Sequence, residues 1–505
     1  MSHFPFNPIE DNLYSAEAAR TLDQAAIAQM RGPGILLMKR AGAAALAELL
    51  EAFGRPALIT VFCGSGNNAG DGYILAALAA QKNISVRVVE VGESNKFSQQ
   101  TQQARKFAQQ ANVQLIAFDP DIQLSEGVVV DSLLGIGYSG ALRKPYAQAV
   151  SLINSAKLPV LSVDIPSGLH ADTGSIADDA VRADITVTFI GAKKGLFTGL
   201  GPVFCGDIIY HSLDISNAVF DVTQPTAQLL DIYALLDELP EWRADIYKHQ
   251  RGHCTVIGGD HGYGGAVAMA GEASLRAGCG LTSVVTQPQH VAAVLARCPE
   301  IITTGVTCGQ QLEPLLERPN VLVIGPGLGR SAWSEQLLQK AMLCALPMVV
   351  DADALNILAE GRVVSDRGIQ QWVLTPHPGE AARLLDTNVA DIQADRYAAV
   401  RKLQRKFNAV VLLKGPGTLI AGDDAMIKVC PYGNPAMATA GMGDLLSGII
   451  GSLIAQGLSL QTATELGCCI HSSAADMAVN ERGPRGLVAT DILLYLHRLL
   501  NRQLL

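Results

Sequence analysis

The sequence lacks the cysteine patterns that bind metals or staple small folds. It has 10 cysteines in 505 residues, but no CxxC pair and no Cys/His cluster at zinc spacing. A zinc module is therefore excluded, and free thiols in a reducing compartment are expected. Cys468 and Cys469 are adjacent in a helix-like run where their side chains diverge, so a disulfide between them is not expected. We expect a cytoplasmic protein.

The chain is also poor in positive charge. Charged residues make up 17% of the sequence, and the formal net charge is -9. This balance argues against nucleic-acid or anionic-membrane binding, so an anionic ligand needs a local positive site. The N-terminus lacks a basic start followed by an apolar core, and no uninterrupted apolar run reaches membrane length. We expect neither a signal peptide nor a membrane span.

What the chain does contain is ample core material. Hydrophobic residues make up 49% of it, with 49 glycines and many alanine-rich helical patterns, which is typical of a compact α/β protein. A chain of this length predicts two or three domains. Motif density drops between residues 215 and 250, which predicts domains over residues 1–222 and 223–505. The alanine-rich helices of the first domain could supply an interface, and we expect a homo-oligomer.

The first half alternates apolar strands with Gly/Ser loops. Helices are predicted over residues 15–30 and 35–53, and a strand over residues 57–63 leads through GSGNNAGDG into a helix near Asp71. Two later strands end in Asp131 and Asp164. Loops after successive parallel strands share one sheet edge, so six side chains should converge there. These are Asn67, Asn68, Asp71, Asp131, Asp164 and Ser167.

Two interpretations of these acids stay open. One is that they simply cap turns and helices, but three strand ends with the same pattern favour the other, a ligand site. Oxygen ligands without cysteine or histidine suit a hard cation better than zinc. Lys193 and Lys194 could balance an anionic ligand, although lysine pairs are usually solvated.

The motifs GSGNNAGDG, DSLLGIG and VDIPSGL together resemble the YjeF N-terminal domain, a Rossmann-like three-layer α/β/α epimerase family that acts on hydrated NADH and NADPH. The resemblance implies that Asp164 handles the proton and that Asn68, Asp131 and Ser167 hold K⁺. The family also includes noncatalytic scaffolds. Two segments would contact the substrate: Asn67, Asn68, Ala69, Gly70 and Asp71, and Gly135, Ile136, Gly137, Tyr138, Ser139, Gly140 and Ala141.

The second half repeats this local architecture without a sequence repeat. The strand in AVVLLKGPGTLIAG leads to Lys414 and Thr418, groups that suit a nucleotide's phosphates better than a simple turn. NPAMATAGMGDLLSGII then predicts a loop entering a helix, with Asp444 in the first turn. A helix N-terminus attracts phosphate, although a glycine-capped helix with a dipole-compatible acid is the alternative. His377, between two prolines, should lie at the ligand edge of the sheet.

Six ordered motifs, GGDHGYGGA, IGPGLGR, DADALN, LTPHPGEA, LKGPGT and NPAMATAGMGD, resemble the ADP- or ATP-dependent NAD(P)H-hydrate dehydratase branch of the ribokinase-like α/β fold. The resemblance implies that Asp444 is the catalytic acid/base and that ADP binds with Mg²⁺. Met442 departs from the family, which more often has a hydroxyl residue there. The substrate contacts would be Ala266, Gly327 and His377, and the ADP contacts Lys414, Gly415, Pro416, Gly417, Thr418, Asn434, Ala440, Gly441, Met442 and Gly443.

Together the two resemblances imply a bifunctional repair enzyme. One domain would interconvert the R and S hydrates, and the other would return the S form to NAD(P)H at the expense of ADP. Two alternatives stay open: a ribokinase-like kinase of a small alcohol, and a noncatalytic first domain. An NAD(P) oxidoreductase is disfavoured because neither half carries GxGxxG with a suitably spaced acid.

Overall fold

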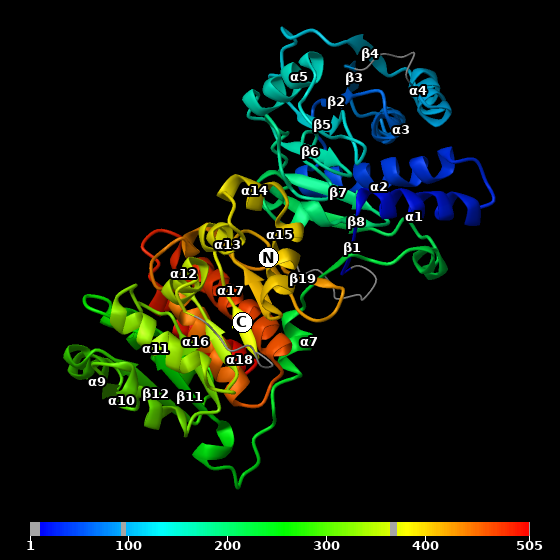
Figure 1. Ribbon diagram of the computed structural model, residues 1–505. Coiled ribbons are helices and arrows are strands. Elements are labelled where there is room, and N and C mark those ends of the chain that lie inside the picture. Colours follow the sequence, from blue (N-terminus) through cyan, green and yellow to red (C-terminus); the bar gives the residue numbers. More distant parts are fainter. Residues whose placement is uncertain (1–10, 92–96, 364–370, 504–505) are drawn as a thin grey trace. The chain divides into compact units, whose positions relative to one another are not determined.

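A computed structural model describes residues 11–91, 97–363 and 371–503 (Figure 1). The chain divides into two compact units, Met1–Gln228 and Leu229–Leu505. This division lies shortly after η3 (Asn217–Val222), where the sequence-based boundary falls. Across the described ranges, no helix combines the length and the apolar character needed to cross a membrane.

The first unit is built on a seven-stranded sheet in the order β4-β3-β2-β5-β6-β7-β9. Every neighbouring pair in this sheet is parallel. The strand order reverses between β2 and β5, and the loops after these two strands therefore diverge and leave room for a ligand. The strands are β2 (Ile59–Cys63), β3 (Val86–Glu90), β4 (Gln114–Ala117), β5 (Val128–Ser132), β6 (Val160–Val163), β7 (Ile185–Phe189) and β9 (Asp207–His211).

Both faces of this sheet are covered. Val61 and Val88 pack into one buried cluster with residues of α1 to α4, whereas their neighbours Phe62 and Val89 pack into another with residues of α5. This alternation confirms the predicted three-layer α/β/α fold. The helices are α1 (Ala16–Gln29), α2 (Ile35–Phe53), α3 (Asn67–Gln81), α4 (Gln99–Gln110), α5 (Lys144–Ser155) and α6 (Gly201–Phe204).

The first described residues of the first unit form a short strand that pairs with two other short strands. β1 (Asn12–Tyr14) pairs in parallel with β8 (Ala192–Lys193) and antiparallel with β10 (Ala227–Leu229). Tyr14 lies opposite Lys193 in this pairing. Ser15 then caps α1 as predicted, its hydroxyl accepting from the Ala18 N–H at 3.1 Å. Helix α1 therefore begins beside the strand that carries Lys193.

One helix start was predicted wrongly. Helix α3 begins at Asn67 and not near Asp71, so the NNAGD segment forms its first turns. Gly66 precedes it without a side-chain cap. The polar residues that suggested a loop are compatible with a helix start, where backbone N–H groups are unpaired.

The second unit has a mixed sheet in the order β13-β12-β11-β14-β15-β16-β17-β18-β19. The pairs from β13 to β17 are parallel, and the last two pairs are antiparallel. Here the order reverses between β11 and β14. The strands are β11 (His253–Ile257), β12 (Leu281–Thr286), β13 (Ile302–Gly305), β14 (Val321–Ile324), β15 (Met348–Val350), β16 (Trp372–Leu374), β17 (Val410–Leu413), β18 (Thr418–Ala421) and β19 (Ile427–Cys430).

Helix α16 is the core helix of this unit, and residues 445–455 of it are all buried. A Cβ on Gly448 would lie 2.1 Å from the Ala270 carbonyl oxygen, so glycine permits the close approach of α16 to α8. The helices are α7 (Ile232–Leu236), α8 (Gly264–Arg276), α9 (Val291–Arg297), α10 (Gly309–Leu312), α11 (Ala332–Met342), α12 (Ala352–Glu360), α13 (Pro378–Leu385), α14 (Val389–Ala394), α15 (Arg396–Phe407), α16 (Met442–Ala455), α17 (Leu460–Arg482) and α18 (Ile492–Leu500).

Candidate active sites

The predicted cation ligands of the first unit meet around the backbone of Leu134. Asn68 Nδ2 donates to the Leu134 carbonyl at 2.9 Å, and Ser167 Oγ accepts from the Leu134 N–H at 2.9 Å. Ser167 Oγ also donates to Asp131 Oδ1 at 2.6 Å. The ends of β5 and β6 and the start of α3 thus bring together three residues that are far apart in sequence.

This cluster combines a buried acid with an unsatisfied carbonyl oxygen. Asp131 is fully buried, and burial raises the pKa of its carboxyl despite bonds from Ser167, Leu133 and Ser162. Those donors are hydroxyls and amides, which carry no charge. Asn68 Oδ1 is buried and accepts no hydrogen bond from the described residues. A buried acid and an unsatisfied carbonyl oxygen are both stabilised by a nearby cation.

Asp164 forms a second cluster with Lys193. Lys193 Nζ donates to Asp164 Oδ1 and to Thr188 Oγ1, the latter at 3.2 Å. Asp164 has a left-handed backbone with φ 68°, a conformation that glycine, asparagine and aspartate adopt more readily than other residues. The interpretation of Lys193 as a solvated lysine is wrong, because its side chain is 3% exposed.

Asp71 is electrostatically coupled to this second cluster. Burial, together with the charge of Asp164, raises the pKa of Asp71 well above its usual value. Five of the six predicted polar residues therefore separate into two groups, one around Leu134 and one around Lys193. Asn67 belongs to neither, because its Oδ1 accepts from Ser98 at 2.7 Å.

The segment predicted to contact the first substrate follows β5. Within it, Tyr138 donates its hydroxyl to the Gly140 carbonyl, and the Ile136 carbonyl accepts from Arg20 at 3.2 Å. Gly135 lies near Asn68, since a Cβ on this glycine would be 3.2 Å from the Asn68 Cβ. The segment and the start of α3 thus lie together at the reversal of strand order.

In the second unit, two predicted substrate contacts lie together at the reversal between β11 and β14. Gly327 has φ +54°, and a Cβ there would lie 2.7 Å from the backbone carbonyl oxygen of Tyr263 and 3.0 Å from the Ala266 Cβ. This position therefore requires glycine on both conformational and steric grounds. His377, the third predicted contact, caps α13, where its Nδ1 accepts from the Gly379 N–H at 2.9 Å.

His377 lies in a positively charged environment. Burial, followed by the charge of Lys414, lowers the pKa of its imidazole. Its ring is 51% exposed, and its Nε2 lies 3.3 Å from Glu380 Oε1. Burial raises the pKa of Glu380 to about 7. A half-exposed neutral imidazole beside the strand ends is suited to contact a ligand.

Asp351, Lys414 and Asp444 form a charged group at the N-terminus of α16. Lys414 Nζ donates to Asp351 Oδ1 at 2.6 Å, and Ser447 Oγ donates to Asp351 Oδ2 at 2.5 Å. Burial alone would lower the pKa of Lys414, but the carboxylates of Asp351 and Glu380 raise it. Lys414 therefore stays cationic, as phosphate binding requires.

Asp444 is the acid of this group that is free to exchange a proton. Burial and the nearby Asp351 charge raise the pKa of Asp444 to about 7. Asp351 has the opposite shift, because Lys414 and two hydroxyls outweigh its burial and lower the pKa of its carboxyl. Two neighbouring carboxyls whose pKa values are shifted in opposite directions are the pattern expected of an acid/base site.

The segments predicted to bind ADP are held in place by hydrogen bonds. Thr418 Oγ1 donates to the Gly415 carbonyl at 3.0 Å, and the buried Arg396 donates to the Lys414 carbonyl at 3.2 Å. Asn434 Nδ2 donates to Asp476 at 2.7 Å. Sequence reasoning placed Asp351 at a strand end within DADALN but gave it no role, and it did not find Arg396 or Asp476.

Residues 35–195 match the family described as YjeF-related protein N-terminus, and residues 254–498 match NAD(P)H-hydrate dehydratase. A bifunctional NAD(P)H-hydrate repair enzyme from Coxiella burnetii is 45% identical over 465 residues, which is 92% of this chain and 94% of that relative. One from Vibrio cholerae is 37% identical over 98% of this chain and 99% of its own length. The chain belongs to the bifunctional NAD(P)H-hydrate repair enzyme family.

This membership agrees with a fold likeness in the second unit. A ribokinase-like superfamily protein from Enterococcus faecalis aligns with a TM-score of 0.51 and 28% identity, over 55% of this chain and 96% of that protein. The predicted ribokinase-like fold is therefore confirmed. As a member of the bifunctional repair family, the chain carries the two predicted domain types in the predicted order.

Met442 is the position where this repair-family member was expected to depart from its relatives. Its side chain is 6% exposed and belongs to the buried apolar cluster around α16. The side chain therefore fills the core, and only the backbone of Met442, at the first position of α16, is available to a nucleotide.

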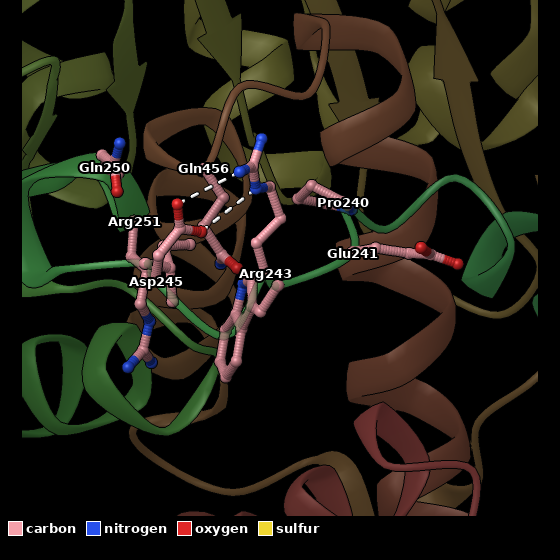
Figure 2. A pocket seen from close by; sticks show the side chains of 9 residues that line it. Pro240, Glu241, Arg243, Asp245, Gln250, Arg251 and Gln456 are labelled. Atoms are coloured by element: carbon pink, nitrogen blue, oxygen red, sulfur yellow. Dashed lines mark hydrogen bonds and ion pairs between the residues drawn. The ribbon is translucent and has the colours of Figure 1, made fainter.

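A pocket of about 330 Å³ lies elsewhere in the second unit (Figure 2). Figure 2 shows Arg243 turned toward Asp245, with which it forms an ion pair at 3.0 Å. Gln456 lines the pocket and is the C-cap of α16, at the opposite end of that helix from Asp444. The predicted site residues of the second unit do not line this pocket, whose lining is Pro240, Glu241, Trp242, Arg243, Asp245, Ile246, Gln250, Arg251 and Gln456.

Proposed function

We propose that the chain repairs hydrated NADH and NADPH, with the first unit interconverting the R and S hydrates and the second dehydrating the S hydrate with ADP. The observation that carries this proposal is the position of Asp444 at the N-terminus of α16, beside the Lys414–Asp351 ion pair. It places a proton acceptor, a cation and unpaired backbone N–H groups together.

The chemistry of the hydrate explains why a phosphoryl donor is needed. The hydrate forms when water adds to the enamine double bond of the reduced nicotinamide ring, with the hydroxyl on the carbon beside the nitrogen. Hydroxide is a poor leaving group from that carbon. We infer that Asp444 takes the hydroxyl proton as the oxygen attacks the terminal phosphorus of ADP, giving a phosphate ester and AMP. Loss of phosphate together with a ring proton then restores the double bond. The balance is hydrate plus ADP to NAD(P)H, AMP and phosphate.

The nucleotide's phosphates would lie between Lys414 and the α16 N-terminus. Gly441 precedes this helix with φ +90°, and a Cβ on Gly443 would lie 3.2 Å from Lys414 Nζ. Only small residues at these positions leave room for a phosphate against the backbone. Mg²⁺ would arrive with ADP and neutralise phosphate charge, because the Asp351 oxygens already accept from Lys414, Thr375 and Ser447.

For the first unit we propose that Asp164 moves the proton during epimerisation. The nitrogen lone pair can expel the hydroxyl as water once it is protonated, and water can return to the other ring face. Asn68, Asp131 and Ser167 would hold K⁺, which supplies a positive charge beside the loop after β5. The buried charge of Asp131 and the unsatisfied Asn68 Oδ1 fit this ion.

The test is recovery of reduced nicotinamide absorbance from an epimeric hydrate mixture with ADP and Mg²⁺. We expect Asp444→Asn to abolish recovery, whereas Asp164→Asn should spare the S form and slow only the R form. Asp423→Asn and Asp207→Asn remove exposed carboxyls from the two units and should leave both rates unchanged. A stable phosphorylated product would instead identify a small-molecule kinase. Equal loss of both epimers in Asp164→Asn would refute the division of labour.

We also infer a cytoplasmic location and a homo-oligomeric state. The ten free cysteines, most of them buried, support a reducing compartment. The alanine-rich helices α1 and α2 offer surfaces on which backbones can approach closely. Light scattering of the purified chain would test the oligomer, and a monomer at micromolar concentration would contradict it.

A further inference from the structure

Helix α15 packs against β17 and β18, which are joined by the loop proposed to bind ADP. Two arginines of this helix, Arg396 and Arg401, hold backbone carbonyls at opposite ends of the strand pair. Arg396 Nη2 donates to the Leu413 and Lys414 carbonyls, each at 3.2 Å, where β17 ends. Arg401 Nη1 donates at 3.0 Å to the Gly422 carbonyl, which follows β18. The Arg396 end is the one that carries the loop.

Arg396 is a buried cation beneath an exposed loop. Its side chain is 0% exposed, whereas Gly415 in the loop is an exposed residue. A Cβ on Gly415 would lie 2.8 Å from Arg396 Nη1, so the guanidinium lies directly against the backbone of this glycine. Burial lowers the pKa of Arg396 to about 10, which leaves the side chain charged at neutral pH. The backbone of Gly415 thus separates a buried positive charge from the solvent side of the loop.

The hydrogen bonds from Arg396 also determine where the loop amides point. The peptide bonds here are trans, so each carbonyl and the N–H that follows it point in opposite directions. The Leu413 carbonyl accepts from Arg396, and the Lys414 N–H donates to the Pro376 carbonyl at 2.9 Å. By the same geometry, the bond to the Lys414 carbonyl turns the Gly415 N–H away from the guanidinium. Backbone N–H groups oriented in this way attract anions such as phosphate.

We propose that Arg396 is a positioning residue of the dehydratase site, which holds the loop from Lys414 to Thr418 in the shape that binds the phosphates of ADP. This inference deepens the proposed dehydratase function and rests on it. Arg396 acts through the loop backbone, because it fixes two successive carbonyls and places a positive charge behind them. Its other terminal nitrogen, Nη1, donates to Gln393 Oε1 at 3.1 Å, which orients the guanidinium. A lysine would keep the charge but not this planar set of donors.

The experiment measures dehydration of S hydrate by the full chain at varied ADP, together with calorimetry of ADP binding in the absence of hydrate. Arg396→Met removes the charge and the donors, and it should raise the KM for ADP about tenfold, as expected for one lost charge-assisted group. The kcat and the KM for S hydrate should change little, because contacts that hold the phosphates equally before and during transfer affect only the KM for ADP. Arg396→Lys, which keeps the charge, should give an intermediate KM for ADP.

The matched control is Arg401→Met, which removes an arginine of the same helix that also holds loop carbonyls, but at the other end of β18. Its ADP affinity should match that of the unaltered chain. Unchanged ADP affinity in the Arg396 variants would overturn the proposal. An equal loss in Arg401→Met, or an equal rise in the KM for S hydrate, would also overturn it, because either would indicate a general loosening of the second unit.

The lysine variant keeps the test decisive if Arg396→Met does not fold. A loss confined to ADP affinity in Arg396→Lys then supports the proposal, and an unchanged ADP affinity overturns it. Absence of ADP binding by the unaltered chain would instead refute the dehydratase function on which the proposal rests.

Discussion

Lys414 and Asp351 form a buried ion pair at 2.6 Å that joins the end of β17 to the end of β15. The Asp351 side chain is 1% exposed and that of Lys414 is 22% exposed. Asp351 also accepts from Ser447 of α16, so one carboxylate connects two strand ends with the helix that carries Asp444. This pair organises the proposed phosphoryl-transfer site.

Asp351→Asn should therefore be strongly destabilising, because it leaves the Lys414 charge without its partner. We expect a loss of about 3 kcal/mol in the free energy of unfolding, typical of a broken buried pair. Urea denaturation measures this loss. Glu335→Gln breaks the exposed pair with Arg362 and should cost at most about 1 kcal/mol. Equal losses in the two variants would contradict a special role for the Asp351 pair.

The raised pKa of Asp444, about 7, predicts the pH dependence of dehydration. Proton acceptance requires the carboxylate, so kcat at saturating ADP and S hydrate should rise with pH up to about 7 and then level off. Below that value it should fall about tenfold per pH unit. A kcat that is flat across this range would show that Asp444 does not limit the reaction.

The same shift makes an opposite prediction for stability. The folded state binds the Asp444 proton more tightly than the unfolded state, so between the ordinary carboxyl pKa and about 7 the stability falls as pH rises. Asp444→Asn removes this cost and should stabilise the chain above neutrality by on the order of 2 kcal/mol, while abolishing dehydration. Thermal melting at acidic and alkaline pH checks the prediction. An equal shift at both pH values would contradict the proton linkage.

Removal of K⁺ should slow only epimerisation. Replacing K⁺ by a quaternary ammonium salt should leave the buried Asp131 carboxylate without a counter-ion and lower the R-to-S rate. Asn68→Ala should abolish the response to K⁺, because it removes the unsatisfied Oδ1. Dehydration of S hydrate by the same preparation is the internal control. An R-to-S rate independent of K⁺ would refute the cation site.

The contact between α16 and α8 gives a prediction about packing. Gly448→Ala would place a Cβ 2.1 Å from the Ala270 carbonyl oxygen, and the backbones would have to separate. We expect a loss of about 2 kcal/mol, measured by thermal melting. For Gly265→Ala in α8, no atom of the described residues lies within 4 Å of the added Cβ, so this control should be neutral or slightly stabilising.

Sequence reasoning predicted the succession of strands and helices along both units, because strand, glycine loop and helix follow each other locally. The helix after LKGPGT and the apolar spacing that begins at Leu445 are examples of such local signals. The α3 start was misplaced, since asparagine and glycine suit both loops and helix starts.

The sequence does not predict which group each charged side chain contacts. The sequence left two interpretations of Lys193 open, because the burial of its side chain depends on β1 and α1, which lie far from it in the sequence. The division of five of the six predicted polar residues into two clusters likewise became clear only from the contacts of Leu134.

The burial of α16 has a consequence for redesign. Residues 445–455 are all buried, so few of the side chains that follow Asp444 in α16 can be replaced without disturbing the core. Randomising the sequence of that helix would unfold the second unit before it changed which substrate the site accepts. Libraries that seek new alcohol acceptors should instead diversify the loop after β11 around the exposed Tyr263, where a side chain can change without moving the acid.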